Sequence, residues 1–203
     1  MFEGFGPGAG AIFLLTILVS FAALKSPEVI EKTILRPYWL TRRGEWERLI
    51  TSGFVHADLG HLFFNMITFF FFAFPLERAI GTARFIILYF VGLVLSDLGT
   101  WYKHRNNPDY ASLGASGAIL AVLFAYIVYF PSQSLVIFPI PIPIPAPLFA
   151  VLYLAYSWWQ SRQNRGRINH DAHIGGAITG LAFVAIFDPV AYRRLFAVAG
   201  NLF

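Results

Sequence analysis

Charge-free stretches of membrane-spanning length constrain this chain more than any other feature. Stretches without Asp, Glu, Lys or Arg lie between Glu3 and Lys25, Asp58 and Glu77, Arg84 and Asp97, Asp109 and Arg162, and Asp171 and Asp188. Only 13% of the 203 residues are charged, about half the share of an average soluble domain, and 57% are hydrophobic. The sequence therefore predicts an integral, multi-pass membrane protein.

The longest gap, between Asp109 and Arg162, cannot be one membrane helix, because a helix rises ~1.5 Å per residue and the hydrocarbon core is ~30 Å thick. Pro131 and alternating prolines at 139–147 mark a return loop, since proline lacks an amide donor and forces extended backbone. Six spans follow, at about 8–24, 58–76, 84–102, 114–130, 147–161 and 172–188. The period-2 alternation of a barrel is absent, so we expect an all-α bundle forming one domain over residues 1–203.

A cleaved signal peptide is the alternative for residues 1–24, where Ser20-Phe21-Ala22 resembles a cleavage site. No Lys or Arg precedes Lys25, so the basic segment of a signal peptide is missing and we favour a span. The absence of cysteine excludes disulfides and thiolate metal sites. No basic helix, zinc pattern or stacking platform is present, so we expect basic loops that contact lipid head groups and no nucleic-acid partner.

Polar side chains capable of chemistry gather at one membrane face, because alternating spans two, four and six begin on the same side. His56, His61 and Asn65 lie at the start of span two, Ser116 at the start of span four and His173 at the start of span six. Taken alone, each has an ordinary explanation, such as a hydroxyl bonded to a backbone carbonyl, an interfacial imidazole or an interhelical amide. Their convergence indicates a functional site.

His61 and Asn65 are four residues apart and share one helical face. Both can donate hydrogen bonds to one point, as can the backbone amide of Ser116 at a helix start, and such donors stabilise an oxyanion. A metal site at His56 and His61 is the alternative, but no carboxylate lies at ligand spacing, so we expect no metal.

Small residues indicate how spans four and six meet. They recur at four-residue spacing at Gly117, Ala121 and Ala125 in span four and at Gly176 and Gly180 in span six. Generic helix packing explains such faces, which allow two backbones to approach closely. The faces begin one and three residues after Ser116 and His173, so close approach would bring the hydroxyl near the imidazole. Phe183 is expected to face lipid.

Four motifs resemble those of the rhomboid family of intramembrane serine proteases, from Trp46 to Gly180. They are Gly114-Ala115-Ser116-Gly117, Ala172-His173-Ile174-Gly175-Gly176 with Gly180, the His56-x4-His61-x3-Asn65 element, and Glu77-Arg78 with Gly81. Each motif alone is weak, but all four in this order and on these spans are specific. The resemblance implies a six-transmembrane-helix rhomboid-like bundle.

The resemblance also implies residue roles. Ser116 would be the nucleophile and His173 the general base of a dyad without a third acid. His61, Asn65 and the Ser116 amide would form the oxyanion hole, with His56 in support. Gly114, Gly117, Gly176 and Gly180 would allow the close packing of the site. The expected activity is a serine endopeptidase that cuts transmembrane segments of membrane proteins and needs no cofactor.

Further parts of the chain take family roles by the same resemblance. Residues 25–56 would be a membrane-embedded first loop, whose aromatic and Arg content suits an interface. Span five and loop 162–171 would form the substrate gate and cap. Leu120 departs from the pattern, because some members carry there an aromatic that stacks on the base. Asp171 lies on a different helical face from His173 and is not expected to act as a third acid, and for Asp97 we expect a structural hydrogen bond.

Two other function classes stay open. A non-catalytic rhomboid-like protein would bind membrane clients, but such proteins lack one or both dyad residues. A small transporter would commonly show inverted repeats, and no half-to-half similarity is visible here.

Two observations predict opposite orientations of the protein in the membrane. Six-span members of the family usually keep both termini in the cytosol, which puts the Ser116 side on the extracytoplasmic face of a bacterial inner membrane. Eleven Lys and Arg residues would then lie outside and four inside, the reverse of the positive-inside rule. We expect the family orientation, because the Glu-rich first loop would pack as a folded element.

Overall fold

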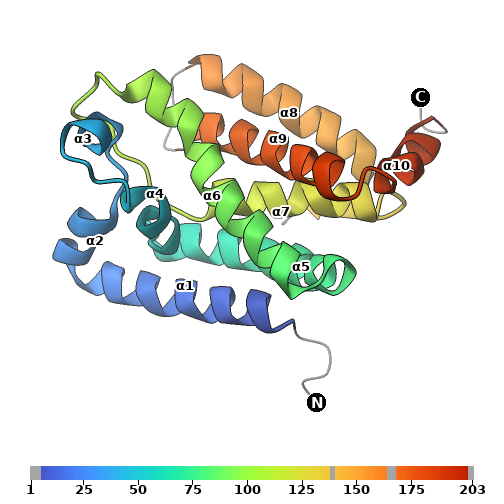
Figure 1. The fold of residues 1–203 in the computed structure, drawn as a ribbon, viewed down its shortest axis with the longest axis horizontal. Coiled ribbons are helices and arrows are strands. Elements are labelled where there is room, and N and C mark those ends of the chain that lie inside the picture. The colour runs from blue at the N-terminus through green and yellow to red at the C-terminus, as the bar shows by residue number, and fades with distance from the viewer. Residues whose placement is uncertain (1–5, 138–139, 164–167, 201–203) are drawn as a thin grey trace.

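The structure, a computed structural model, describes residues 6–137, 140–163 and 168–200, which are mostly helical and form a bundle (Figure 1). The long helices are α1 (Pro7–Lys25), α5 (Leu59–Ile80), α6 (Thr82–His104), α7 (Ser116–Tyr129), α8 (Ala146–Gln163) and α9 (His170–Phe187). The short helices are α2 (Pro27–Thr33), α3 (Pro37–Arg42), α4 (Arg48–Thr51), the 3-10 helix η1 (Ser52–Phe54) and α10 (Ala191–Ala199).

Each expected span corresponds to one long helix, with ends displaced by a few residues. Among the described residues, α1, α5, α6 and α9 are long and apolar enough to cross a membrane. The apolar α7 has 14 residues, which is about 21 Å of helix and less than the ~30 Å hydrocarbon core. The 18-residue α8 is less apolar than these four. The helical membrane bundle is confirmed, whereas a count of six full spans is not.

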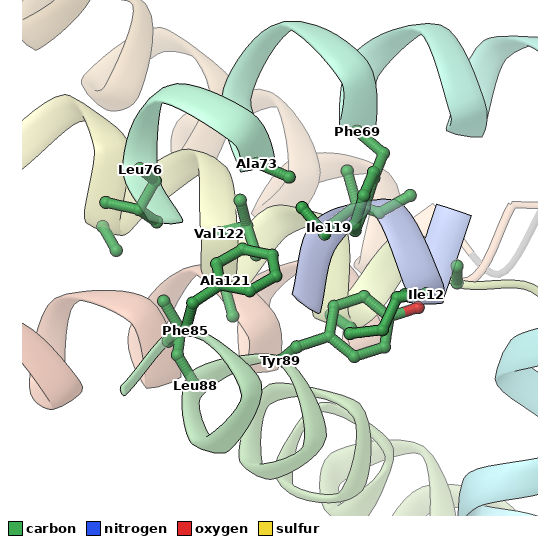
Figure 2. Close-up of a cluster of buried hydrophobic side chains, with 14 of the residues drawn as sticks. Ile12, Phe69, Ala73, Leu76, Phe85, Leu88, Tyr89, Ile119, Ala121 and Val122 are labelled. Atoms are coloured by element: carbon green, nitrogen blue, oxygen red, sulfur yellow. The ribbon is translucent and has the colours of Figure 1, made fainter. Parts of the chain in front are cut away.

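The shortness of α7 matches its central position. Eleven of its residues are buried. Figure 2 shows part of the largest core cluster, where the labelled side chains of α7 meet others from α1, α5 and α6. The labelled residues are Ile12 of α1, Phe69, Ala73 and Leu76 of α5, Phe85, Leu88 and Tyr89 of α6, and Ile119, Ala121 and Val122 of α7. A helix that contacts mostly protein does not have to match the thickness of the bilayer.

The proline-rich return segment is paired rather than a plain loop, so this expectation was wrong in part. Strands β1 (Ser134–Ile137) and β2 (Ile140–Pro145) form an antiparallel hairpin; Pro139 lies outside the described residues. Successive amides of a strand point to opposite edges, so prolines at every second position leave all the missing donors on one edge. The isoleucines between them keep their amides on the other edge, which can pair with β1.

Residues 25–56 form a folded unit at the end of the bundle where α5, α7 and α9 begin (Figure 1). Ion pairs join Arg36 to Glu31 at 2.7 Å and Arg48 to Glu45 at 2.9 Å. This unit is also tied to the segment before α7, because Leu35 and Ser112 exchange two backbone hydrogen bonds of 2.9 Å. The predicted first loop is therefore a scaffold for the start of α7.

The Glu77 motif joins α5 to α1 and α6. The buried Glu77 carboxylate accepts hydrogen bonds from the amides of Gly8 at 2.9 Å and Ala9 at 2.7 Å, at the start of α1. Amides in the first turn of a helix have no partner within it, so the carboxylate stabilises them. Gly81 separates α5 from α6 with a φ of +82°, a conformation that favours glycine.

The small residues of α7 and α9 allow these two helices to pack closely. A Cβ atom at Gly176 would overlap the carbonyl oxygen of Gly117, and one at Gly180 would overlap that of Ala121. A Cβ atom at Gly117 would overlap Ser96 of α6 and would lie 3.6 Å from the Ala172 carbonyl oxygen of α9, so Gly117 is enclosed by both helices. The expectation that Phe183 faces lipid was wrong, because it is only 7% exposed and belongs to the main core. Helix α9 packs against both α6 and α7, so more of its circumference is enclosed than one contact face would imply.

Candidate active site

Ser116 and His173 meet at the starts of two adjacent helices. Ser116 is the first residue of α7, and His173 lies in the first turn of α9. The distance between Ser116 Oγ and His173 Nε2 is 2.9 Å, and both residues are half-buried. A hydroxyl that donates to Nε2 requires this nitrogen to be unprotonated. The neutral ring then carries its proton on Nδ1.

Tyr153 of α8 occupies the other side of the His173 ring. Its Oη lies 2.8 Å from Nδ1, and the two rings are nearly parallel, at 28° with centroids 6.3 Å apart. Leu120, where some family members carry an aromatic, is buried in the neighbouring apolar cluster. No local pattern marks Tyr153, because this residue is one of several aromatics in an apolar helix and matches no motif.

The turn before Ser116 lies against His61 and Asn65. Gly114 has a φ of +113°, and a Cβ atom there would come within 2.7 Å of the His61 ring and 3.8 Å of Asn65 Nδ2. Any side chain at Gly114 would therefore be strained and would displace the imidazole. Helix α7 begins two residues after Gly114, and its first amides have no partner within the helix. Two side chains and a helix start thus converge beside Ser116.

Asp58 sets the direction of His61. It is the N-cap of α5, and its carboxylate accepts a hydrogen bond of 2.8 Å from the His61 amide. This cap fixes the first turn, so that His61 and Asn65, one turn later, lie on the same side of α5.

His56 contacts the turn that precedes Ser116. It is fully buried, and its Nε2 lies 3.5 Å from the Ala115 amide. Its Nδ1 lies 2.8 Å from Ser20 Oγ, and the Ser20 hydroxyl donates to the Phe54 carbonyl at 2.9 Å. Because Ser20 uses its only proton on Phe54, His56 must donate from Nδ1 and accept at Nε2.

The surroundings of His56 favour this neutral form. Burial, with a smaller contribution from the nearby His61, lowers the pKa of His56 to about 3, and Asp58 opposes the shift. A neutral ring can accept at Nε2, whereas a protonated ring cannot. The sequence motif identified His56, but its partner Ser20 in α1 carried no signal.

Asn169 joins three elements at the same end of the bundle. Its side-chain oxygen caps α9 by accepting from the Ala172 amide at 3.0 Å. Its Nδ2 donates to Thr100 of α6 at 2.9 Å and to Ser112 at 3.0 Å. The segment leading to Ser116 is thereby tied to the start of α9. Sequence reasoning missed this residue, although an Asn directly before an apolar helix is a recognisable cap signal.

Two acidic residues, Asp171 and Asp97, lie near the site and have different surroundings. Asp171 accepts from Lys103 Nζ at 2.9 Å and from Ser161 Oγ at 2.5 Å, so it joins α9 to α6 and α8. Asp97 is buried and lines a small polar cavity beside Ser116. The cavity measures about 10 Å³, which is space for roughly one water molecule. Within the described ranges, no group of three or more His, Asp or Glu could hold a metal ion.

Comparison with known proteins identifies the family. The rhomboid domain family model matches residues 43–189, well over half of the chain. A candidate rhomboid protease of Bacillus subtilis, YdcA, is 42% identical over 84 residues, which is 41% of this chain and 41% of that protein. Rhomboid protease GluP of Bacillus subtilis is 28% identical over 141 residues, or 70% of this chain and 26% of the relative.

A eukaryotic relative matches to a similar degree. The mitochondrial rhomboid protein 1 of Saccharomyces cerevisiae is 28% identical over 138 residues, which cover 66% of this chain and 40% of that protein. The matches span less than half the length of each of these relatives. The domain match, these relatives and the apolar helices agree, and the chain is an integral membrane protein that belongs to the rhomboid family.

Proposed function

We propose that this protein is an intramembrane serine endopeptidase that cuts transmembrane segments of other membrane proteins. The observation that carries the proposal is the 2.9 Å contact between Ser116 Oγ and His173 Nε2 at the start of two helices. Membership of a family whose members are generally intramembrane serine proteases supports the same reading.

The chemistry follows from the atoms at the site. Ser116 Oγ attacks the scissile carbonyl carbon while its proton passes to His173 Nε2. The carbonyl oxygen becomes an oxyanion, which accepts hydrogen bonds from the Ser116 amide and from the side chains of His61 and Asn65. His173 then gives its proton to the leaving amine, so that the peptide C–N bond breaks and an acyl-enzyme remains. A water molecule, deprotonated by His173, hydrolyses this ester and restores Ser116.

The surroundings of the dyad fit this cycle. The polar cavity beside Ser116 has space for about one water molecule, and hydrolysis needs water close to the nucleophile. The half-exposed residues of α8 leave that helix less enclosed than α7, which suits a gate for a helical substrate. The cap proposed at 162–171 includes residues 164–167, which lie outside the described residues.

We further propose the membrane arrangement implied by this function. All six long helices, α7 and α8 included, cross the bilayer, and the dyad faces the extracytoplasmic side of a bacterial inner membrane. The partners are transmembrane substrates and the lipid bilayer, with no cofactor or nucleic acid. The chemistry above uses only groups of the protein and water, so we expect a metal chelator to leave turnover unchanged.

The deciding experiment measures cleavage of a transmembrane substrate and labelling by a fluorophosphonate probe, with purified protein in detergent. We expect wild type to do both, and Ser116→Ala and His173→Ala to do neither while folding normally. Ser132→Ala is the control, because Ser132 is exposed and lies outside the site. Substantial cleavage by Ser116→Ala would exclude the dyad. A wild-type protein that binds membrane clients without cleavage or labelling would favour the non-catalytic class.

A further inference from the structure

Tyr153 presents a fixed oxygen to the imidazole of His173. The ring of Tyr153 stacks on Phe149 with centroids 5.5 Å apart at 22°, and it contacts Phe124 at 6.1 Å. All three belong to one apolar cluster between α7, α8 and α9. Packing against these two rings restricts the movement of Tyr153. Its hydroxyl oxygen is therefore held 2.8 Å from Nδ1 of His173.

The direction of this hydrogen bond follows from the proposed reaction, in which Ser116 donates its proton to His173. His173 Nε2 must be unprotonated to accept from Ser116, so the single proton of the neutral ring is on Nδ1. Nδ1 then donates, and Tyr153 Oη accepts. The alternative tautomer would place a donor against the Ser116 hydroxyl and leave the nucleophile without a base.

We propose that Tyr153 is a positioning residue that fixes the tautomer and orientation of His173, as a neutral third partner of the dyad. This inference rests on the proposed function. The role is comparable to that of the carboxylate in a Ser-His-Asp triad, which orients the base and selects its tautomer. A phenol carries no charge at neutral pH, so it orients the imidazolium formed during the reaction with weaker electrostatic stabilisation than a carboxylate would give.

The other neighbours of His173 do not supply this partner. Asp171 is engaged by Lys103 and Ser161. Leu120 has no polar side-chain atom. His170 places its ring edge-on to His173 with centroids 5.5 Å apart, but the hydrogen bond at His173 Nδ1 runs to Tyr153.

Tyr153 belongs to a different helix from either member of the dyad. Ser116 and His173 stand on α7 and α9, which the contacts of Gly176 and Gly180 hold together. Tyr153 comes from a third helix and is independent of that pair of backbones. A substitution at Tyr153 can therefore alter the base without separating the dyad.

The test uses Tyr153→Phe, which keeps the ring and removes only the hydroxyl. Loss of one hydrogen bond that the transition state uses predicts a fall in kcat of roughly 3- to 10-fold with KM unchanged. Tyr156→Phe is the matched control on the same helix, because its hydroxyl accepts from Gln160 and not from a histidine. We expect the control to retain wild-type kcat and KM.

A second measurement reads the tautomer directly and does not need turnover. Protein with 15N-labelled histidine is studied by NMR at neutral pH without substrate, and His173→Ala identifies the signals of His173. We expect wild type and Tyr156→Phe to hold the proton on Nδ1, and Tyr153→Phe to give a mixture of tautomers. Unchanged ring signals of the other histidines would show that Tyr153→Phe is folded.

The outcomes separate the two proposals. Wild-type kcat together with an unchanged tautomer in Tyr153→Phe would overturn the role of Tyr153. A fall in kcat without a tautomer change would assign the hydroxyl another role and also overturn it, as would an effect confined to KM. If wild type neither cleaves nor labels, the proposed protease function fails, while the tautomer measurement still tests the contact.

Discussion

His56 shows how a single residue can make this site sensitive to acid. It is fully buried, and burial lowers its pKa from 6.5 to about 3, so it stays neutral where an unfolded chain would be protonated. Between these values the unfolded state binds the extra proton, so the free energy of unfolding falls as the pH falls from 6.5 towards 3. Above pH 6.5 both states are neutral, and His56 contributes no pH dependence.

We expect this residue to account for about 2 kcal/mol of stability lost between pH 7 and pH 5, at about 1.4 kcal/mol per pH unit below 6.5. Thermal unfolding in detergent should show a steeper loss on acidification for wild type than for His56→Gln. The range from pH 7 to pH 8 is the internal control, where the two proteins should have parallel profiles. Equal acid sensitivity of the two proteins would contradict a buried, neutral His56.

Asn65 and His61 make a separate prediction about the oxyanion. Both side chains lie beside the Gly114 turn, next to the first amides of α7. Removal of one oxyanion donor can cost ~10²–10³ in turnover, and a second donor softens that loss. We expect Asn65→Ala to lower kcat with little change in KM, and the double change with His61→Ala to lower it further. Wild-type turnover in the double variant would rule out these two residues as oxyanion donors.

Residues within motifs could be predicted from the sequence, but their partners from other elements could not. Ser116 and His173 were found because the charge gaps fixed the spans and the spans fixed a common face. Tyr153, Ser20 and Asn169 have partners that lie 20 to 69 positions away in the sequence. Such contacts depend on how helices rotate and pack, and no periodicity in one sequence encodes that rotation.

At the scale of elements, the positions of the helices could be predicted, whereas the length of α7 and the β1–β2 hairpin could not. Charged residues are excluded from hydrocarbon, so helix positions follow the charge gaps closely. The length of α7 does not follow from that rule, because α7 is surrounded by protein. The hairpin β1–β2 was missed because alternating prolines remove the donors of one strand edge only, and pairing through the other edge leaves no sequence sign of a partner.

Helix α9 gives a prediction about packing rather than chemistry. A side chain at Gly176 would overlap the Gly117 carbonyl, so Gly176→Leu must push α9 away from α7. A displacement of ~1 Å can cost ~10²-fold in rate when reacting groups need close alignment. We expect Gly176→Leu to lose most cleavage and most fluorophosphonate labelling while still inserting into the membrane, since only apolar bulk is added.

The matched control for Gly176→Leu is Ile178→Leu on the same helix. Ile178 is 57% exposed, and its change to Leu conserves the side-chain volume, so cleavage should remain at the wild-type level. Full labelling and cleavage by Gly176→Leu would mean that the α7–α9 contact tolerates bulk and does not set the distance of the dyad.

At the scale of the whole molecule, the polar network and most of the basic residues lie at one end. Residues 25–56 and the starts of α5, α7 and α9 gather there, whereas α10 lies at the opposite end (Figure 1). Many basic residues of this end are held against the protein: Arg36, Arg43, Arg48 and Lys103 have carboxylate partners. Arg42 and Arg43 also cover the rings of Tyr38 and Trp39. The excess of positive charge therefore belongs largely to folded structure.

This arrangement leads to the prediction on orientation. Eleven basic residues on the dyad side and four on the other side would place the dyad in the cytosol if the positive-inside rule decided alone. Folding of residues 25–56 onto the bundle gives those charges a structural role, so we expect the family orientation with both termini in the cytosol.

Reporter fusions in bacterial cells measure the orientation. A fluorescent protein that matures only in the cytosol should be active when fused after Phe203, and a phosphatase active only outside should be silent there. Fusions after Asn107, an exposed residue between α6 and α7, should give the reverse pattern. Phosphatase activity after Phe203 combined with fluorescence after Asn107 would show that the charge count governs topology. The dyad would then face the cytosol, and its substrates would be cut at the inner face of the membrane.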